Sequence, residues 1–194
     1  MKIKPKTYDN ILYKATEAAN EFLDSARKLY GKRVLSTDEI ISLYEKKFKV
    51  SFCIESASFK TLNYPVCNAG ALMKRRSDNK FDVLINSDKP LPFQRFSILH
   101  AIGHIATNCF VNDFHEKACY TVCSDIAYVL PDNLADTANE EGEAIANIFA
   151  LKIMIPMDLL IEQLKNKKSI YEMSPYFITE PDTIIARISI GDVV

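Results

Sequence analysis

Two of the three histidines in this sequence, His100 and His104, are the side chains whose type and spacing best suit metal chemistry. They lie in residues 93–107, where apolar residues recur at helical spacing. A spacing of four on a helix puts both imidazoles on one face, one turn apart. Two ligands placed in this way can hold one tetrahedral Zn²⁺ ion. The alternative is a pair of hydrogen-bonded core histidines, because such pairs also arise by chance.

A catalytic zinc site also needs a third protein ligand from another element and an open position for water. The helix expected over residues 136–154 offers Glu143, whose face otherwise carries small or amide side chains such as Ala146 and Asn147. Small residues allow two helices to pack closely. Gly103, beside the second histidine, likewise removes a side chain where a neighbouring element or substrate can approach. Without the histidine pair, a solvated surface glutamate would be the preferred interpretation of Glu143.

The elements that position these residues follow from the spacing of apolar side chains along the chain. Helical spacing predicts helices over residues 8–30, 40–48, 93–107, 136–154, 157–164 and 169–190, the last interrupted by a turn. Alternating apolar residues predict strands over residues 50–55, 69–73 and 81–86. We therefore expect an α+β fold, in which a small antiparallel sheet of about three strands packs on a mostly helical domain. The long connection over residues 108–135 is expected to be functional or partly helical.

The length of 194 residues fits a single domain, which we expect to cover residues 1–194. No composition bias indicates a repeat array or a disordered tail. The patterns divide this domain into N-terminal helices, a small sheet, zinc-site helices and C-terminal helices, over residues 1–48, 49–88, 89–156 and 157–194.

Charge and hydropathy exclude two classes of partner. The formal net charge of −1 gives no reason to expect a nucleic-acid surface, because phosphate binding usually needs a concentrated basic face. The basic residues 74–76 are interpreted as a solvated turn. No stretch has the roughly 18 uninterrupted apolar residues of a membrane span, and no apolar signal-peptide segment follows the basic N-terminus. We therefore expect a cytoplasmic protein that contacts neither nucleic acid nor membrane.

The sequence has an odd number of cysteines: Cys53, Cys67, Cys109, Cys119 and Cys123. Without an export signal, free thiols in a reducing cytoplasm are the default expectation. Cys119 and Cys123 could share a helix face and form a second zinc site with His115. Structural zinc sites, however, usually pair cysteines at tighter spacing and need a fourth ligand nearby. We therefore expect all five thiols to be free.

Three segments of the chain resemble motifs of the ImmA/IrrE metallopeptidases. Residues 95–104 read Arg-Phe-Ser-Ile-Leu-His-Ala-Ile-Gly-His and look like that family's RFSxAHELGH segment. Residues 143–156 are similar to its ExxANxFAxxLLMP segment, and residues 83–86 to its IxIN strand. The C-terminal FxVSxxAxxxRL segment matches less closely, because its Val, Ser and Ala are replaced by Thr179, Glu180 and Thr183. The resemblance covers roughly residues 40–190.

The resemblance implies a zincin-like fold and a zinc site with His100, His104 and Glu143 as the metal ligands. Glu140 and Glu141 are alternatives for the third ligand, although they match the motif less well. Acidic residues are also favoured near a helix N-terminus for electrostatic reasons alone.

A longer histidine motif, the metzincin pattern, is excluded. It needs Gly and His at two positions where this chain has Thr107 and Phe110. His115 therefore has no ligand role by motif, and we expect it to be a surface or loop residue.

The chain departs from the family's motif at one position, because Ala101 stands where the family has glutamate. In a zincin that glutamate takes a proton from the attacking water and later gives it to the leaving amine. Alanine can do neither. Since the missing side chain is not a metal ligand, we expect the zinc site to survive. Zn²⁺, two neutral imidazoles and one carboxylate then leave a net positive charge, which favours anionic or carbonyl ligands.

Two explanations compete for Ala101. An engineered Glu→Ala change leaves every other motif residue intact, whereas a naturally inactive enzyme often shows further decay. His100, Gly103, His104 and Glu143 are all present, so an engineered, inactive form is favoured.

The resemblance implies a zinc-dependent metalloendopeptidase that cleaves a helix-turn-helix transcriptional repressor, as an anti-repressor of a phage or mobile element. The alternative is a naturally inactive zinc-binding pseudopeptidase that acts by binding a partner. Direct DNA binding through residues 169–190 is disfavoured, because polar positions there such as Glu172, Glu180 and Asp182 are acidic.

Overall fold

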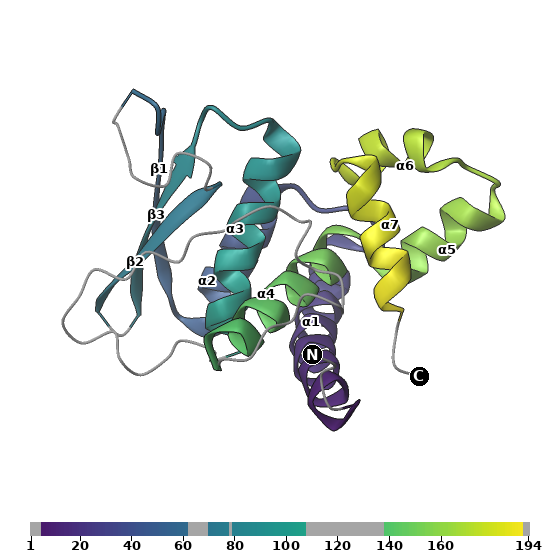
Figure 1. The fold of residues 1–194 in the computed structure, drawn as a ribbon, viewed down its shortest axis with the longest axis horizontal. Helices are drawn as coiled ribbons and strands as arrows, with labels where there is room; N and C mark the ends of the chain where they lie inside the picture. The colour runs from purple at the N-terminus through teal and green to yellow at the C-terminus, as the bar shows by residue number, and fades with distance from the viewer. Residues whose placement is uncertain (1–4, 62–69, 78, 108–137, 192–194) are drawn as a thin grey trace.

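The computed structural model describes residues 5–61, 70–77, 79–107 and 138–191. Within these residues the fold is mostly helical, with one small sheet (Figure 1), which confirms the expected α+β class. The helices are α1 (Pro5–Tyr30), α2 (Thr37–Phe48), α3 (Leu91–Ala106), α4 (Ala138–Met154), α5 (Met157–Lys165), α6 (Ile170–Phe177) and α7 (Pro181–Ile190). The strands are β1 (Ser51–Ala57), β2 (Ala71–Ser77) and β3 (Lys80–Asn86). The predictions for residues 108–135 lie outside the described residues.

The sheet has the strand order β1-β3-β2 and is mixed. β2 runs antiparallel to β3, to which a short turn joins it, whereas β1 runs parallel to β3. The prediction of an antiparallel sheet is therefore wrong for the β1–β3 pair. That prediction assumes that neighbours in sequence also pair, which is only a tendency. β3 takes the centre because its alternate side chains form a buried apolar row: Phe81, Val83 and Ile85.

β2 is longer than the sequence predicts, because it includes the basic residues 74–76. The interpretation of these residues as a solvated turn is wrong. Lys74 stands opposite Asp82 of β3, and the guanidinium of Arg76 donates a hydrogen bond to the Asp82 carboxylate. Edge strands commonly carry charged residues, which discourage pairing with other chains.

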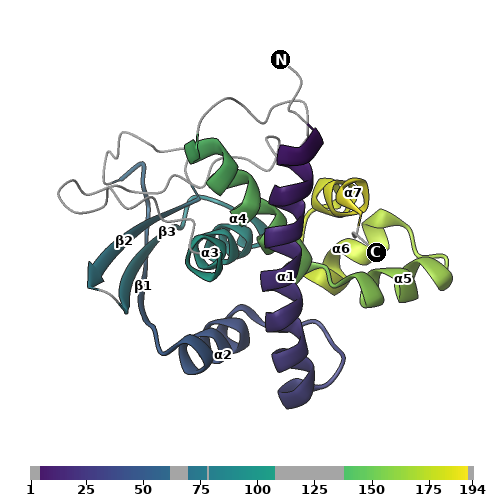
Figure 2. The same ribbon diagram turned by 90° about the horizontal axis from the view of Figure 1, so that it is seen from below.

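Helix α3 lies between the sheet and α4 (Figures 1 and 2), and it contacts β2, β3 and α4. Residues 95–104 of α3 are all buried. The sequence predicts one apolar face and one polar face for this helix, but both are covered. The sheet covers the apolar side, and α4 covers the side that carries the histidines. The polar groups of α3 therefore need partners within the protein.

Helix α1 packs against α4 on the side away from α3 (Figure 2). The N-terminal half of α1 contributes Ile11, Leu12 and Ala15 to a small apolar cluster. The partners of these residues on α4 are Ala144, Ile145 and Ile148. Further along α1, residues such as Phe22 and Ala26 join the main core with α2, the sheet and α3. Helix α4 is thus held from two sides.

The C-terminal helices α5, α6 and α7 lie on the other side of α1 from the sheet (Figures 1 and 2). The buried Arg187 of α7 connects them to the end of α4, because its Nε donates to the Ile155 carbonyl at 3.0 Å. None of the described helices is by itself long and apolar enough to cross a membrane. α4 and α5 reach that length and composition only as a pair, across a bend of 51°.

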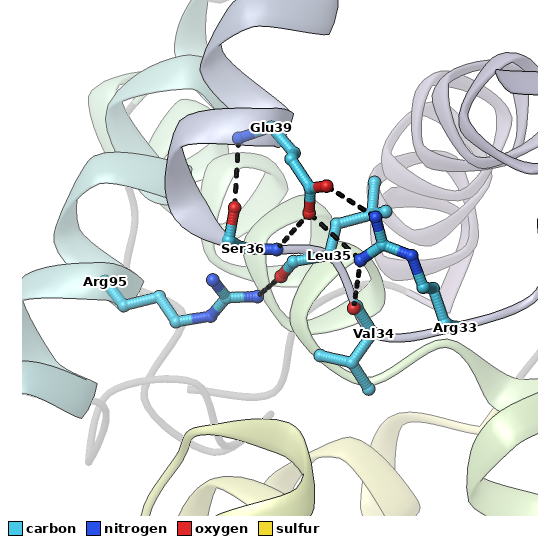
Figure 3. A network of polar contacts seen from close by, with 6 residues as sticks. All are labelled: Arg33, Val34, Leu35, Ser36, Glu39 and Arg95. Carbon is cyan, nitrogen blue, oxygen red and sulfur yellow. Dashed lines mark hydrogen bonds and ion pairs between the residues drawn. The ribbon is translucent and has the colours of Figure 1, made fainter. Parts of the chain in front are cut away.

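The N-terminal half of α3 is anchored by Arg95 (Figure 3), which is 2% exposed. Its guanidinium donates to the Leu35 carbonyl at 2.7 Å and to the Thr37 hydroxyl at 3.0 Å. Both acceptors lie where the α1–α2 loop enters α2. Ser36 caps α2 there in a capping box with Glu39. Burial lowers the pKa of Arg95 to about 10, which still leaves it charged at neutral pH.

Candidate metal centre

Helix α3 places His100 and His104 on one face, as predicted. Both side chains are buried, with 2% and 6% exposed respectively. Their Nε2 atoms lie 2.9 Å apart, and the two rings meet edge to face. Two imidazole nitrogens therefore converge on one point in the interior of the protein.

Helix α4 brings Glu143 to the same point. Glu143 Oε2 lies 3.1 Å from His100 Nε2, and Glu143 Oε1 lies 3.3 Å from His104 Nε2. Among the described residues, these three side chains form the one group of three or more His, Cys, Asp or Glu that could hold a metal ion. The structure therefore brings together the three predicted ligands, although Glu143 is far from both histidines along the chain.

The close approach of α3 and α4 depends on small residues at their crossing. A Cβ atom added at Gly103 would lie 2.9 Å from the Ala146 carbonyl oxygen and 3.0 Å from Ala146 Cα. It would also lie 3.1 Å from the ring of Phe149. Real Cβ atoms essentially never come within 3.0 Å of such neighbours. Gly103 and Ala146 thus allow the two backbones to approach until the short Glu143 side chain reaches both histidines.

The spacing of the three ligand atoms fits a tetrahedral zinc ion. With bonds of about 2.0–2.1 Å, such an ion separates its ligand atoms by about 3.3 Å. The observed separations of 2.9, 3.1 and 3.3 Å are close to this value. Two imidazoles and one carboxylate are also a ligand set typical of catalytic zinc. The residues present therefore fit this ion without rearrangement of the helices.

The charges of the site favour a cation. Burial by itself raises the pKa of Glu143, but its polar contacts with His100 and His104 outweigh this effect and lower the pKa to about 2. Burial is also the main cause that lowers the pKa of His104, with the hydrogen bond to Glu143 opposing it. At neutral pH the site therefore presents a carboxylate and an uncharged His104 imidazole, which are the protonation states that bind metal.

Asn147 contacts the same cluster from α4. Its Oδ1 lies 2.6 Å from His100 Nδ1, and Asn147 is 9% exposed. The sequence placed Asn147 on the face of Glu143 but gave it no role. The signal that could have found this contact is the spacing of four residues from Glu143, which puts both side chains on one side of α4.

The other predicted candidates lie elsewhere. Glu141 points to α1, where it forms an ion pair with Lys14 at 3.5 Å, and it is absent from the cluster. Ala101 is 1% exposed and forms part of the core. Cys53 is a free, exposed thiol, as predicted. The side chain of Glu140 lies outside the described residues, as do the remaining candidates His115, Cys67, Cys109, Cys119 and Cys123.

An α+β domain with two histidines on one helix and a glutamate on a second helix is the arrangement of a metallopeptidase of the zincin type. Residues 68–189 match the Peptidase_M78 family, the IrrE N-terminal-like domain. This match covers more than half of the chain, so the chain belongs to that family, as the sequence motifs predict. No curated protein is similar enough to the chain to match it.

Proposed function

We propose that this chain is a zinc metalloendopeptidase domain in an inactive form, with an intact metal site and no general base. The observation that carries the proposal is the ligand triangle of His100, His104 and Glu143, whose sides of 2.9–3.3 Å suit one tetrahedral zinc ion. Membership of a peptidase family supports the reaction class.

Among the three ligands, Glu143 has the most exposed side chain. The Glu143 side chain is 38% exposed, whereas the two histidines are buried. A peptide and a water molecule would therefore approach from the side of Glu143. A zinc ion held there supplies Lewis acidity, which activates water and polarises a peptide carbonyl. His100 and His104 contribute neutral nitrogen ligands, and Glu143 contributes the one negative charge.

Ala101 removes the proton transfer that peptide hydrolysis needs. Its methyl group can neither accept a proton from the attacking water nor return one to the leaving amine. Among the described residues, the one carboxylate in the cluster is that of Glu143. As a metal ligand, Glu143 would not be free to act as the base. We therefore expect the chain as it stands to bind zinc without cleaving peptides.

The substrate that we propose is a helix-turn-helix transcriptional repressor in the cytoplasm, which makes the active form an anti-repressor of a phage or mobile element. This proposal rests on the resemblance to the ImmA/IrrE metallopeptidases. A membrane or nucleic-acid partner is not part of the proposal, since the formal net charge is −1 and no described helix alone suits a membrane.

A second candidate is a naturally inactive pseudopeptidase that sequesters such a partner. The observation that favours it is Ala101 beside a complete ligand set. Zn²⁺ with two neutral imidazoles and one carboxylate carries a net positive charge, so it would attract a carbonyl or anionic group of the partner. The sequence of the gene at position 101 would show whether this alanine is natural or engineered.

The test is to compare the chain with its Ala101→Glu and Ala101→Gln variants. Glutamine has the size of glutamate but cannot act as a base, so it is the matched control. Each protein is co-expressed with a repressor encoded beside its gene, and cleavage is followed by mass spectrometry. We expect a single cut with Ala101→Glu, at a rate at least about 10²–10⁴-fold above the other two.

Two results would argue against this account. Equal cleavage by the parent chain and by the Ala101→Glu variant would show that the assigned base is wrong. A folded, zinc-loaded Ala101→Glu variant that binds the repressor but never cuts it would favour the pseudopeptidase. Because residue 101 is buried, thermal unfolding of each variant establishes that the added side chain is tolerated.

A further inference from the structure

Helix α4 contacts both ring nitrogens of His100. Glu143 Oε2 lies 3.1 Å from Nε2, and Asn147 Oδ1 lies 2.6 Å from Nδ1. We propose that Asn147 is a positioning residue, which keeps the Nδ1–H tautomer of His100 and so directs the Nε2 lone pair toward the metal. This inference rests on the metal site of the proposed function, but it concerns a residue that is not a ligand.

The role proposed for Asn147 follows from the chemistry of its side-chain amide. A neutral imidazole carries one N–H, and the other nitrogen is an acceptor. The Asn147 carbonyl oxygen can only accept, so its 2.6 Å contact with Nδ1 is a hydrogen bond when the imidazole proton is on Nδ1. Nε2 is then unprotonated and available as a ligand, since the hydrogen bond at one ring nitrogen decides the role of the other. Because the amide is neutral, it orients the ring without stabilising a charged imidazolium.

The location of Asn147 makes this contact difficult to replace. Asn147 is 9% exposed and His100 is buried, so bulk water has little access to the hydrogen bond. Glu143 and Asn147 are one turn apart on α4, so the same rigid helix fixes the distance to each ring nitrogen. Removing the Asn147 oxygen would leave a buried N–H without this acceptor and allow the ring to rotate or to change tautomer.

The first test measures zinc affinity by competition with a chromophoric chelator, so it needs no peptidase activity. Asn147→Leu removes the acceptor at similar size, whereas Asn147→Asp keeps it. We expect zinc binding that is about 10–100-fold weaker in Asn147→Leu, the range seen when outer-shell partners of metal sites are lost. Asn147→Asp should bind zinc at least as tightly as the parent, because a carboxylate keeps the acceptor and raises the basicity of the imidazole ligand. Asn166→Ala, at the exposed end of α5, is the control and should not change the affinity.

The second test reads the tautomer directly, through long-range ¹H–¹⁵N spectra of the imidazoles in the zinc-loaded protein. The parent and Asn147→Asp should show His100 protonated at Nδ1 and bound to zinc through Nε2. Asn147→Leu should show a mixture of tautomers or broadened His100 signals, with His104 less affected. A structural role alone would lower stability without changing these spectra.

The outcomes separate this inference from the proposed function. Parent-like affinity and a parent-like His100 spectrum in folded Asn147→Leu would overturn the positioning role alone. Coordination of His100 through Nδ1 in the parent would overturn it as well. If zinc binding also survives His104→Ala and Glu143→Ala, the metal site itself is wrong, and the proposed function fails with it.

Discussion

The two long faces of helix α4 differ in composition and in what they contact. The face toward α3 carries Glu143, Ala146 and Asn147, which are polar or small. The face toward α1 carries Ala144, Ile145 and Ile148, which form an apolar cluster with α1. Each face also has one glutamate, since Glu143 meets the histidines and Glu141 meets Lys14. One face of α4 thus positions the ligands, and the opposite face attaches the helix to α1.

This difference shows how a buried metal site can be accommodated in a protein whose core is otherwise apolar. Close packing needs small residues, but small residues bury little apolar surface and so contribute little free energy. The α1 face supplies the apolar burial that the α3 face gives up. We expect substitutions on the α1 face to change the free energy of unfolding, and substitutions on the α3 face to change metal binding.

Ile148→Ala should have the largest effect on stability. Ile148 is 3% exposed in the cluster between α1 and α4. Truncation of a buried isoleucine to alanine typically lowers the free energy of unfolding by about 2–5 kcal/mol. Urea unfolding measures this loss, and zinc stoichiometry of the folded variant should stay at the parent value. The control Ile185→Ala, at a half-exposed site on α7, should change the free energy by less than about 1 kcal/mol.

Gly103→Ala, at the contact between α3 and α4, should lower zinc affinity, in contrast to Ile148→Ala. The new Cβ would lie 2.9 Å from the Ala146 carbonyl oxygen, so α4 has to move away from α3. Overpacking of this kind costs about 1–3 kcal/mol, partly offset by the roughly 1 kcal/mol higher helix propensity of alanine. Zinc affinity should fall, because Glu143 moves away with α4. Unchanged zinc affinity would mean that the close crossing is not needed for the site.

Glu141→Gln should have the smallest effect. The Lys14–Glu141 pair is 3.5 Å long, with side chains 48% and 35% exposed, so solvent screens it. Exposed ion pairs contribute about 0–1 kcal/mol. Thermal unfolding should therefore be nearly unchanged, and zinc content should equal that of the parent. A loss of zinc would show that the third ligand has been assigned to the wrong glutamate.

Much of this fold follows from local patterns in the sequence. The helical spacing of apolar residues predicted α1 and α2 to within a few residues. The His100–His104 spacing and the small face around Glu143 predicted which side chains the structure brings together. These features depend on contacts between residues close in the chain, or on ligand chemistry that restricts the choice of residue.

Features that depend on distant contacts were not predictable in the same way. The parallel β1–β3 pair requires β3 to pair with a strand that is not its sequence neighbour. The burial of α3 on both sides depends on α4, which follows a long connection. The link from Arg95 to the Leu35 carbonyl spans 60 residues and uses a backbone acceptor, which has no sequence signature.

The most direct test of the metal centre is the zinc content of a matched pair on the two faces of α4. The parent, Glu141→Gln and Glu143→Gln are purified without chelator, and metal is measured per folded chain. We expect about one zinc per chain in the parent and in Glu141→Gln, and a sharp loss in Glu143→Gln, because a neutral amide is a poor zinc ligand. Full zinc content in folded Glu143→Gln would contradict the assignment of Glu143 as the third ligand.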